Sequence, residues 1–173
     1  GGARVLREIE ERLAGLPRLP LARATLLAPI QRPPRIFAIG LNYQKHAAES
    51  NMQVQKVPTV FMKLPSSVVG PDHPIILPKI SQQPDYEAEF AVVIGKPGYQ
   101  IPAARAMEYV FGYTIVNDVS ARDIQLATSQ WTLGKSFPTF TPLGPAITTV
   151  DEVPDPHALG ISLTIDGPTM QSS

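Results

Sequence analysis

The sequence predicts an α+β domain built mainly of β-strands. Short apolar segments, rich in β-branched and aromatic residues and bounded by glycine or proline, recur along the chain. Few helical segments lie between them, which argues against a doubly wound sheet, where strands and helices alternate. The 19 prolines are spread over the 173 residues and favour many short elements joined by stiff turns.

The composition narrows the class of protein. Hydrophobic residues make up 43% and charged residues 17% of the chain, enough to form one core. The 15 basic and 15 acidic residues balance, so nothing favours nucleic acid or an anionic membrane as a partner. The absence of cysteine excludes disulfides, thiolate catalysis and cysteine-ligated zinc. No apolar run reaches the roughly 18 residues of a membrane span.

Residues 1–34 are predicted to form an appendage before the main domain. Apolar residues at helical spacing predict an amphipathic helix over 3–14, ended by Gly15 and Pro17. The following segment is interrupted by prolines and has one predicted strand, at 25–28. The start lacks the apolar core of a secretory signal, so we expect a cytoplasmic protein. It also lacks an initiator Met, which leaves room for a targeting segment removed by cleavage.

The main domain is predicted to span residues 35–173. Its strands are expected where apolar runs end in glycine, proline or polar residues. A helix is expected where Pro102 opens a segment that Gly112 closes. A helical turn and a loop are expected over 121–134. The predicted strands lie within 35–43, 57–64, 74–78, 86–95, 113–120, 141–150 and 160–167.

Two glutamates in the most hydrophobic strand are the most informative feature. Glu87 and Glu89 are two residues apart, so both side chains point to the same face of a strand. Neighbouring carboxylates in an apolar strand repel one another and resist desolvation. A divalent cation would compensate, and an all-oxygen site suits Mg²⁺, Mn²⁺ or Ca²⁺. The alternative is an ordinary strand with one solvated face.

Asp118 is a candidate for the third carboxylate. It follows an apolar strand whose neighbouring residues are expected to be buried. Its alternative role is to cap a turn at the end of that strand. Asp123 is a weaker candidate, because Arg122 beside it and the expected helical turn suit a helix cap or an ion pair.

Two further segments carry candidate catalytic side chains. His46 and Glu49 are three residues apart, which places them on one helical face as a possible general-base pair; a surface pair is the alternative. Lys135 follows Gly134, which allows the backbone to pass close to another group. That lysine could stabilise an enolate or oxyanion, and a solvated loop lysine is the alternative.

Together these segments resemble the fumarylacetoacetate hydrolase family. The resemblance covers about residues 35–173 and follows the family's order. The pair DYEAE and NDVSARD is its most specific part. The matching strings are GLNYQKHAAE, PTVFMKLPSSVVGP, DYEAEFAVVIGK, YVFGYTIVNDVSARDIQ and GKSFPTFTPLGP.

The resemblance implies a mixed β-sandwich roll, a homodimer, and Mg²⁺ held by three carboxylates. Residue by residue, it implies four roles: metal ligands, a catalytic dyad on a loop that orders over substrate, an active-site lysine, and residues that contact substrate or support the site. The metal ligands are Glu87, Glu89 and Asp118, and the catalytic dyad is His46 and Glu49. The active-site lysine is Lys135, and the residues that contact substrate or support the site are Arg122 and Gln125.

The chain departs from the family pattern in two places. Pro138 stands where many members have Asp, which predicts a local change in the loop and no loss of the metal. A Thr-Gly-Thr-Pro motif and the strands that complete the roll do not appear in the 173 residues. We expect this remainder to be missing from the sequence, since a half-built sheet would leave open edges.

The resulting functional prediction is a Mg²⁺-dependent hydrolase that cleaves a carbon–carbon bond in a 2,4-dioxo acid of the acylpyruvate or fumarylpyruvate type. In this scheme His46, oriented by Glu49, activates water, and Lys135 stabilises the departing enolate. The alternatives are an oxaloacetate-type decarboxylase or a 2-oxo acid tautomerase on the same site. A non-catalytic metal-binding scaffold is the alternative from another class.

Overall fold

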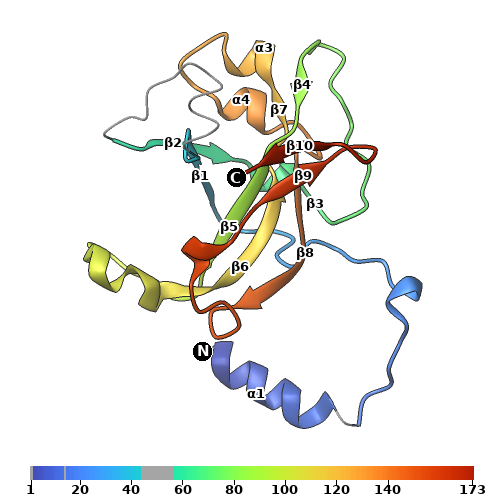
Figure 1. Ribbon diagram of the computed structural model, residues 1–173, viewed down its shortest axis with the longest axis vertical. Coiled ribbons are helices and arrows are strands. Elements are labelled where there is room, and N and C mark those ends of the chain that lie inside the picture. Colours follow the sequence, from blue (N-terminus) through green and yellow to red (C-terminus); the bar gives the residue numbers. More distant parts are fainter. Residues whose placement is uncertain (1, 14, 44–56) are drawn as a thin grey trace.

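The computed structural model describes residues 2–13, 15–43 and 57–173 (Figure 1). It is mainly β, as predicted. A four-stranded sheet of order β3-β8-β6-β5 forms its centre. β5 (Ala88–Ile94) pairs antiparallel with β6 (Val110–Asn117), which pairs antiparallel with β8 (Thr141–Thr149). β3 (Val68–Val69) joins the other edge of β8 in parallel.

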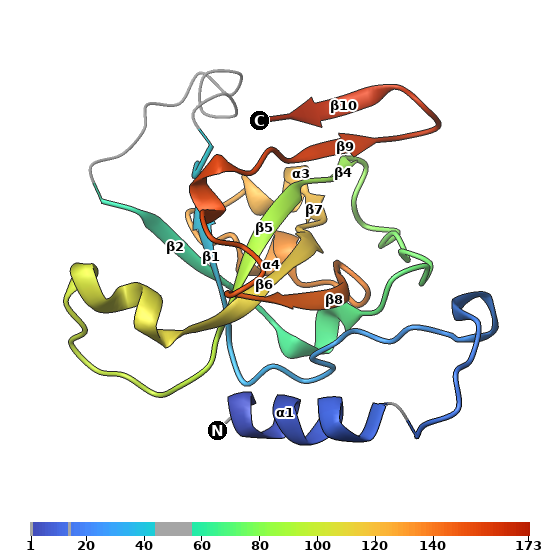
Figure 2. The same cartoon turned by 60° about the horizontal axis from the view of Figure 1, so that its bottom comes forward.

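Three two-stranded sheets surround this centre. β1 (Ile36–Gly40) pairs with β2 (Thr59–Lys63), and β4 (Pro84–Asp85) pairs with β7 (Ser120–Ala121). β9 (Ser162–Thr164) and β10 (Thr169–Ser172) form a hairpin whose second strand was not predicted. In both views the hairpin lies beside β5 (Figures 1 and 2), where the Gln171 amide accepts from the Ala88 N–H at 2.8 Å.

The helices of the described residues are short. α1 (Gly2–Leu13) agrees with the helix predicted from the sequence. α3 (Arg122–Gln125) and α4 (Thr132–Lys135) replace the predicted helical turn and loop. Single 3₁₀ segments are η1 (Leu21–Arg23), η2 (Pro65–Ser67), η3 (Ala103–Tyr109) and η4 (Pro156–Ala158). No helix of the described ranges combines the length and apolarity needed to cross a bilayer.

The helix predicted from Pro102 to Gly112 is longer than the helical segment in the structure. It forms the 3₁₀ segment η3, and β6 begins already at Val110. Gly112 lies inside β6 and not after a helix. A side chain there would collide with the Thr148 carbonyl of β8. This glycine therefore permits close pairing of β6 with β8. From the sequence alone, such a glycine cannot be distinguished from one that ends a helix.

The predicted strands at 25–28 and 74–78 are wrong. The first segment forms no ladder, and it crosses Gly70, whose missing side chain admits the backbone of Leu26 and Ala28. The second begins at Pro74 and ends at Pro78, which have no N–H to donate. There the Ile76 N–H donates to the Thr139 hydroxyl at 2.8 Å, so a side chain replaces the ladder partner.

The buried residues form two apolar clusters beside a polar interior. Ala28, Val116 and Leu143 form the first cluster. The second consists of Val119, Ala121 and Phe140, with Ile124 and Phe137 against it. Charged side chains are buried nearby, at the end of the molecule where β2, the β6–β7 connection and α4 meet. They are Lys63, Asp118 and Lys135, none more than 3% exposed.

Candidate active site

The β5–β6 pair brings two of the predicted carboxylates together. Glu87 directly precedes β5, and Asp118 directly follows β6. The Asp118 N–H donates to the Glu87 carbonyl at 2.9 Å, and the Glu87 N–H donates to the Asn117 side-chain carbonyl at 3.2 Å. The antiparallel register thus places residues 31 positions apart side by side at one end of the sheet.

Lys135 links these two carboxylates. Its Nζ donates to Glu87 Oε2 at 2.7 Å and to Asp118 Oδ2 at 3.0 Å. The lysine ends α4, where Gly134 packs against the backbone of Gln125; an added Cβ would lie 2.5 Å from the Gln125 N. The close approach expected at Gly134 is therefore real, but the neighbour is α3. The alternative of a solvated loop lysine is wrong, since Lys135 is 1% exposed.

Lys63 is a buried cation of this cluster that the sequence reasoning missed. Its Nζ donates to Asp118 Oδ1 at 2.5 Å, to the Val119 carbonyl at 3.5 Å and, over a shorter distance, to the Lys135 carbonyl. Burial lowers the pKa of Lys63, and Asp118 opposes that shift. The available signal was its position in TVFMK, where it shares a strand face with the buried Phe61.

Arg122 and Gln125 support Glu87 from the other side. Arg122 Nη1 lies 2.6 Å from Glu87 Oε1 and 3.0 Å from Gln125 Oε1. Nε and Nη2 both lie 2.8 Å from Asp85 Oδ2. Arg122 and Gln125, which were predicted to contact substrate or support the site, therefore both lie within the cluster. Arg122 contacts Glu87 directly, and Gln125 contacts Arg122.

Glu89 has a different environment. Burial, the largest cause, and the neighbouring charges of Glu87 and Asp118 together raise the pKa of Glu89 to about 8. Lys135 and a hydrogen bond with Tyr43 act in the opposite direction. The Tyr43 hydroxyl also accepts from the Phe90 N–H at 3.1 Å, which fixes it beside the strand. Glu89 is thus electrostatically coupled to both other predicted ligands.

The donor chemistry of the three carboxylates fits a hard cation. Glu87, Glu89 and Asp118 offer only oxygen atoms, which Mg²⁺ prefers. The charge effects on Glu89 show that the three groups lie close enough to repel one another. Within residues 2–13, 15–43 and 57–173, however, no three ligating side chains converge in metal-binding geometry. Instead, the Lys135 ammonium provides positive charge between Glu87 and Asp118.

Other predicted residues have separate outcomes. His46 and Glu49, and most of the predicted substrate-ordered loop, lie outside the described residues. Asp123 lies apart from the Lys63–Lys135 contacts and holds a turn: it accepts from the Ser81 hydroxyl at 2.7 Å and the Gln82 N–H at 2.8 Å. These bonds agree with the prediction that Asp123 has a structural role. Its partners are Ser81 and Gln82, and not Arg122 as the predicted ion pair required.

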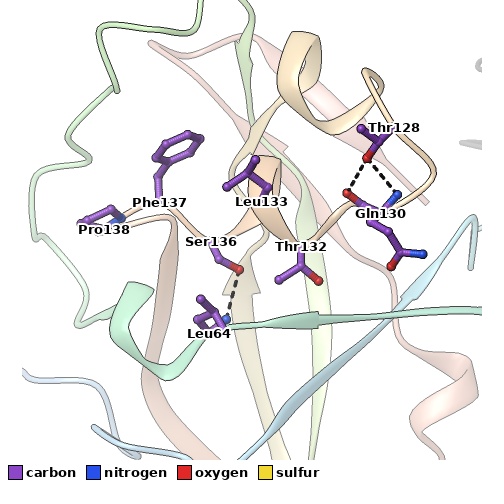
Figure 3. Close-up of a pocket in the computed structure, with 8 residues that line it drawn as sticks. All are labelled: Leu64, Thr128, Gln130, Thr132, Leu133, Ser136, Phe137 and Pro138. Atoms are coloured by element: carbon purple, nitrogen blue, oxygen red, sulfur yellow. Dashed lines mark hydrogen bonds between the residues drawn. The ribbon is translucent and has the colours of Figure 1, made fainter.

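A mainly apolar pocket of about 440 Å³ includes the residues that follow the two lysines in sequence (Figure 3). Leu64 and Ser136, the residues after Lys63 and Lys135, line it and join through a 3.1 Å hydrogen bond from the Leu64 N–H to the Ser136 hydroxyl. None of the eight described residues that line the pocket carries a carboxylate. The remaining lining residues are Thr128, Gln130, Thr132, Leu133, Phe137 and Pro138.

Comparison with known proteins defines the class. Residues 35–173 match the family described as fumarylacetoacetate (FAA) hydrolase C-terminal. The chain belongs to this family. It is 50% identical over 161 residues to the mitochondrial oxaloacetate tautomerase Fahd2a of Rattus norvegicus, covering 92% of the chain and 51% of that protein. The chain therefore spans about half the length of the curated relatives it matches.

Solved structures agree with the predicted fold. A 5-carboxymethyl-2-hydroxymuconate delta-isomerase from Mycobacterium smegmatis superposes with a TM-score of 0.79 at 42% identity, covering 91% of this chain and 62% of that one. A fumarylacetoacetate hydrolase from Exiguobacterium antarcticum gives a TM-score of 0.77 at 37% identity, covering 95% and 62%. These similarities confirm a fold of the fumarylacetoacetate hydrolase type.

Proposed function

We propose that the chain contributes the carboxylate–lysine part of a Mg²⁺-dependent enzyme that interconverts the keto and enol forms of a small 2-oxo acid of the oxaloacetate type. The observation that carries the proposal is the buried Lys135 ammonium, held between Glu87 and Asp118. A buried ammonium can stabilise the negative oxygen of an enolate far better than one in water. The names of the relatives favour this reaction over the predicted hydrolysis.

The proton movements of this reaction balance without a co-reactant. A base removes a proton from carbon 3 of the keto acid, the C–H electron pair forms the C2–C3 double bond, and the 2-oxo oxygen becomes negative. Protonation of that oxygen gives the enol, and the reverse order regenerates the ketone. Lys135 is proposed to stabilise the oxygen, and His46 oriented by Glu49 to carry the proton. Arg122 and Gln125 keep Glu87 oriented.

We further propose that Glu87, Glu89 and Asp118 hold the metal ion. When bound, Mg²⁺ would supply Lewis-acid polarisation of the 2-oxo group. Mn²⁺ and Ca²⁺ accept the same oxygen ligands and are the alternative ions. The support is the charge coupling that raises the pKa of Glu89, since a cation near these carboxylates would offset their mutual repulsion.

Hydrolysis of an acylpyruvate remains the second candidate, and the similarity to the hydrolase from Exiguobacterium antarcticum favours it. Both reactions pass through an enolate. In hydrolysis His46 would activate a water that attacks the distal carbonyl, and the C–C bond electrons would leave as the enolate of a 2-oxo acid. In oxaloacetate-type decarboxylation the same enolate forms as carbon dioxide departs.

The test uses the full-length protein with and without EDTA. Tautomerisation predicts metal-dependent acceleration of the change in ultraviolet absorbance when enol oxaloacetate relaxes to its keto form, with no loss of carbon. Two organic fragments from an acylpyruvate would establish hydrolysis, and carbon dioxide from oxaloacetate would establish decarboxylation. A metal-binding protein that accelerates none of these reactions would be the non-catalytic scaffold, and the proposed function would be wrong.

Assembly and location are also proposals. We infer a homodimer from the tendency of the resembling family, and sedimentation of the full-length protein would test it. The oxaloacetate tautomerase Fahd2a of Rattus norvegicus is described as mitochondrial, which does not support the predicted cytoplasmic location. We therefore propose the mitochondrion for a full-length protein, and fractionation of cells that produce it would decide.

A further inference from the structure

Lys63 has a bonding pattern that matches a structural clamp on the proposed catalytic lysine. Lys63 is 1% exposed, as is Lys135. An ammonium group carries three N–H donors. Lys63 directs them to three acceptors, namely the Asp118 carboxylate, the Val119 carbonyl and the Lys135 carbonyl. The protonated side chain is therefore matched to the groups around it.

Those three acceptors belong to different parts of the fold. Asp118 and Val119 form the connection between β6 and β7, whereas Lys135 ends α4. Lys63 itself ends β2. One buried ammonium therefore joins the end of β2 to two other segments, whose acceptors are 55 to 72 positions away from Lys63 in sequence. Such a bond fixes the relative placement of segments that local sequence cannot fix.

The two lysines act on the two oxygens of the same carboxylate. Lys63 Nζ lies 2.5 Å from Asp118 Oδ1, and Lys135 Nζ lies 3.0 Å from Asp118 Oδ2. Lys63 also holds the backbone carbonyl of Lys135. It thereby restrains both the acceptor and the main chain of the lysine that reaches Glu87 at 2.7 Å.

We propose that Lys63 is a positioning residue that holds Asp118 and the main chain of Lys135, so that the Lys135 ammonium stays at the carboxylates. Its relevance to catalysis rests on the proposed function, but the placement of Lys135 does not. Lys63 itself needs no contact with substrate. Loss of the ammonium should release Lys135, and misplacement of a catalytic group by about 1 Å can lower turnover on the order of 10²-fold.

The absence of cysteine allows a matched substitution. In Lys63→Cys the thiol is the only one in this chain, and alkylation of the unfolded protein with 2-bromoethylamine restores an ammonium at lysine length. Alkylation with 1-iodopropane gives a neutral side chain of the same length. Refolded proteins, including wild type taken through the same steps, are compared after circular dichroism shows native folding. Directly expressed Lys63→Met provides a second neutral variant if refolding fails.

The first measurement is the rate at which a dilute acylating reagent modifies Lys135, followed by mass spectrometry relative to the exposed Lys79 and Lys96. The neutral side chains should raise this relative rate at least about tenfold, and the restored ammonium should return it to the wild-type value. Ser136→Ala is the matched control, because it removes the parallel Leu64–Ser136 bond and keeps Lys63. An unchanged Lys135 rate in a folded neutral variant would overturn the inference.

The second measurement is turnover in the full-length protein. Lys63→Met should lower kcat on the order of 10²-fold and change KM less than about threefold. A folded neutral variant with wild-type kcat would overturn the catalytic part of the inference. If the wild-type protein catalyses none of the proposed reactions, the proposed function fails, while the Lys135 labelling rate still decides the positioning role.

Discussion

Two kinds of carboxylate lie within one cluster. Both oxygens of Asp118 accept from lysines, and the oxygens of Glu87 contact Arg122 and Lys135. Glu89 instead has a hydrogen bond with the neutral Tyr43, and no lysine or arginine of the described residues forms an ion pair with it. Ion pairs within the fold compensate the negative charges of Asp118 and Glu87, whereas the desolvation of Glu89 is not offset by an ion pair among the described residues. Glu89 is therefore the carboxylate through which protons and cations should act on this molecule.

The largest expected effect comes from the cation that the two compensated carboxylates share. Lys135→Met removes the ammonium, leaves an unbranched side chain one heavy atom shorter, and should lower turnover by 10² to 10³, the usual loss for one oxyanion donor. Steady-state kinetics of the full-length protein measures it. Lys96→Met is the control, since Lys96 is exposed and lies over the Tyr109 ring. Equal turnover in both variants would remove Lys135 from the mechanism.

The next largest effect is expected on Mg²⁺ binding, and it tests whether Glu89 is a metal ligand. Glu89→Gln keeps the size and removes the charge, so Mg²⁺ affinity should fall by more than about tenfold, the lower end of the loss for outer-shell partners. Titration calorimetry measures the affinity. Asp123→Asn is a matched control, because Asp123 holds a turn through Ser81 and Gln82. Equal affinities of the two variants would contradict the metal assignment.

Much of this arrangement follows from the sequence. Short apolar runs bounded by glycine, proline or polar residues predicted β1, β2, β5, β6, β8 and β9. The spacing of Glu87 and Glu89 predicted that their carboxylates share a strand face, and the charge of Glu87 contributes to the raised pKa of Glu89. Asp118 joins them because strand pairing brings its backbone to Glu87. The pairing itself depends on long-range register, which local patterns do not encode. Lys63 was missed for a related reason: its partners are distant in sequence, and a lysine at a strand end is ordinarily solvated.

The failed strands show the same limit. Residues 25–28 and 74–78 have a strand-like composition, but neither segment pairs with a strand in the structure. Backbone passage over Gly70 and a bond from Ile76 to the Thr139 hydroxyl are both tertiary contacts. Apolar composition predicted a strand at 25–28, yet only the neighbouring segments decide whether such a segment joins a ladder.

A third prediction concerns pH and stability without metal. The pKa of Glu89 is about 8 in the folded protein, against an ordinary value of 4.5 for a glutamate carboxyl. The folded state therefore holds a proton that the unfolded state has lost between these values, so this contribution favours folding at low pH and is lost as pH rises through about 8. Relative to Glu89→Gln, the wild type should lose on the order of 3 kcal/mol between pH 5 and 9.

Urea denaturation of both proteins in EDTA across this pH range measures the difference. The variant serves as the control, because it retains every other titrating group. Parallel stability curves for the two proteins would show that Glu89 titrates normally, and the contrast with Glu87 and Asp118 would then rest on hydrogen bonds alone. Added Mg²⁺ should reduce the wild-type loss, since a cation favours the ionised carboxylate.

The smallest effect is expected at an ion pair outside the cluster. Arg105 Nη2 lies 2.8 Å from Glu108 Oε2, but their side chains are 59% and 47% exposed. Solvent screens such a pair, and fixing two long side chains opposes its attraction. Arg105→Ala should therefore leave the urea midpoint unchanged within error. Asp85→Asn should lower it, because Arg122, with a side chain only 21% exposed, loses a charged partner while Glu87 still holds it in place. A similar shift in both variants would mean that burial does not determine what these ion pairs contribute, and the distinction between compensated and uncompensated carboxylates would lose its physical basis.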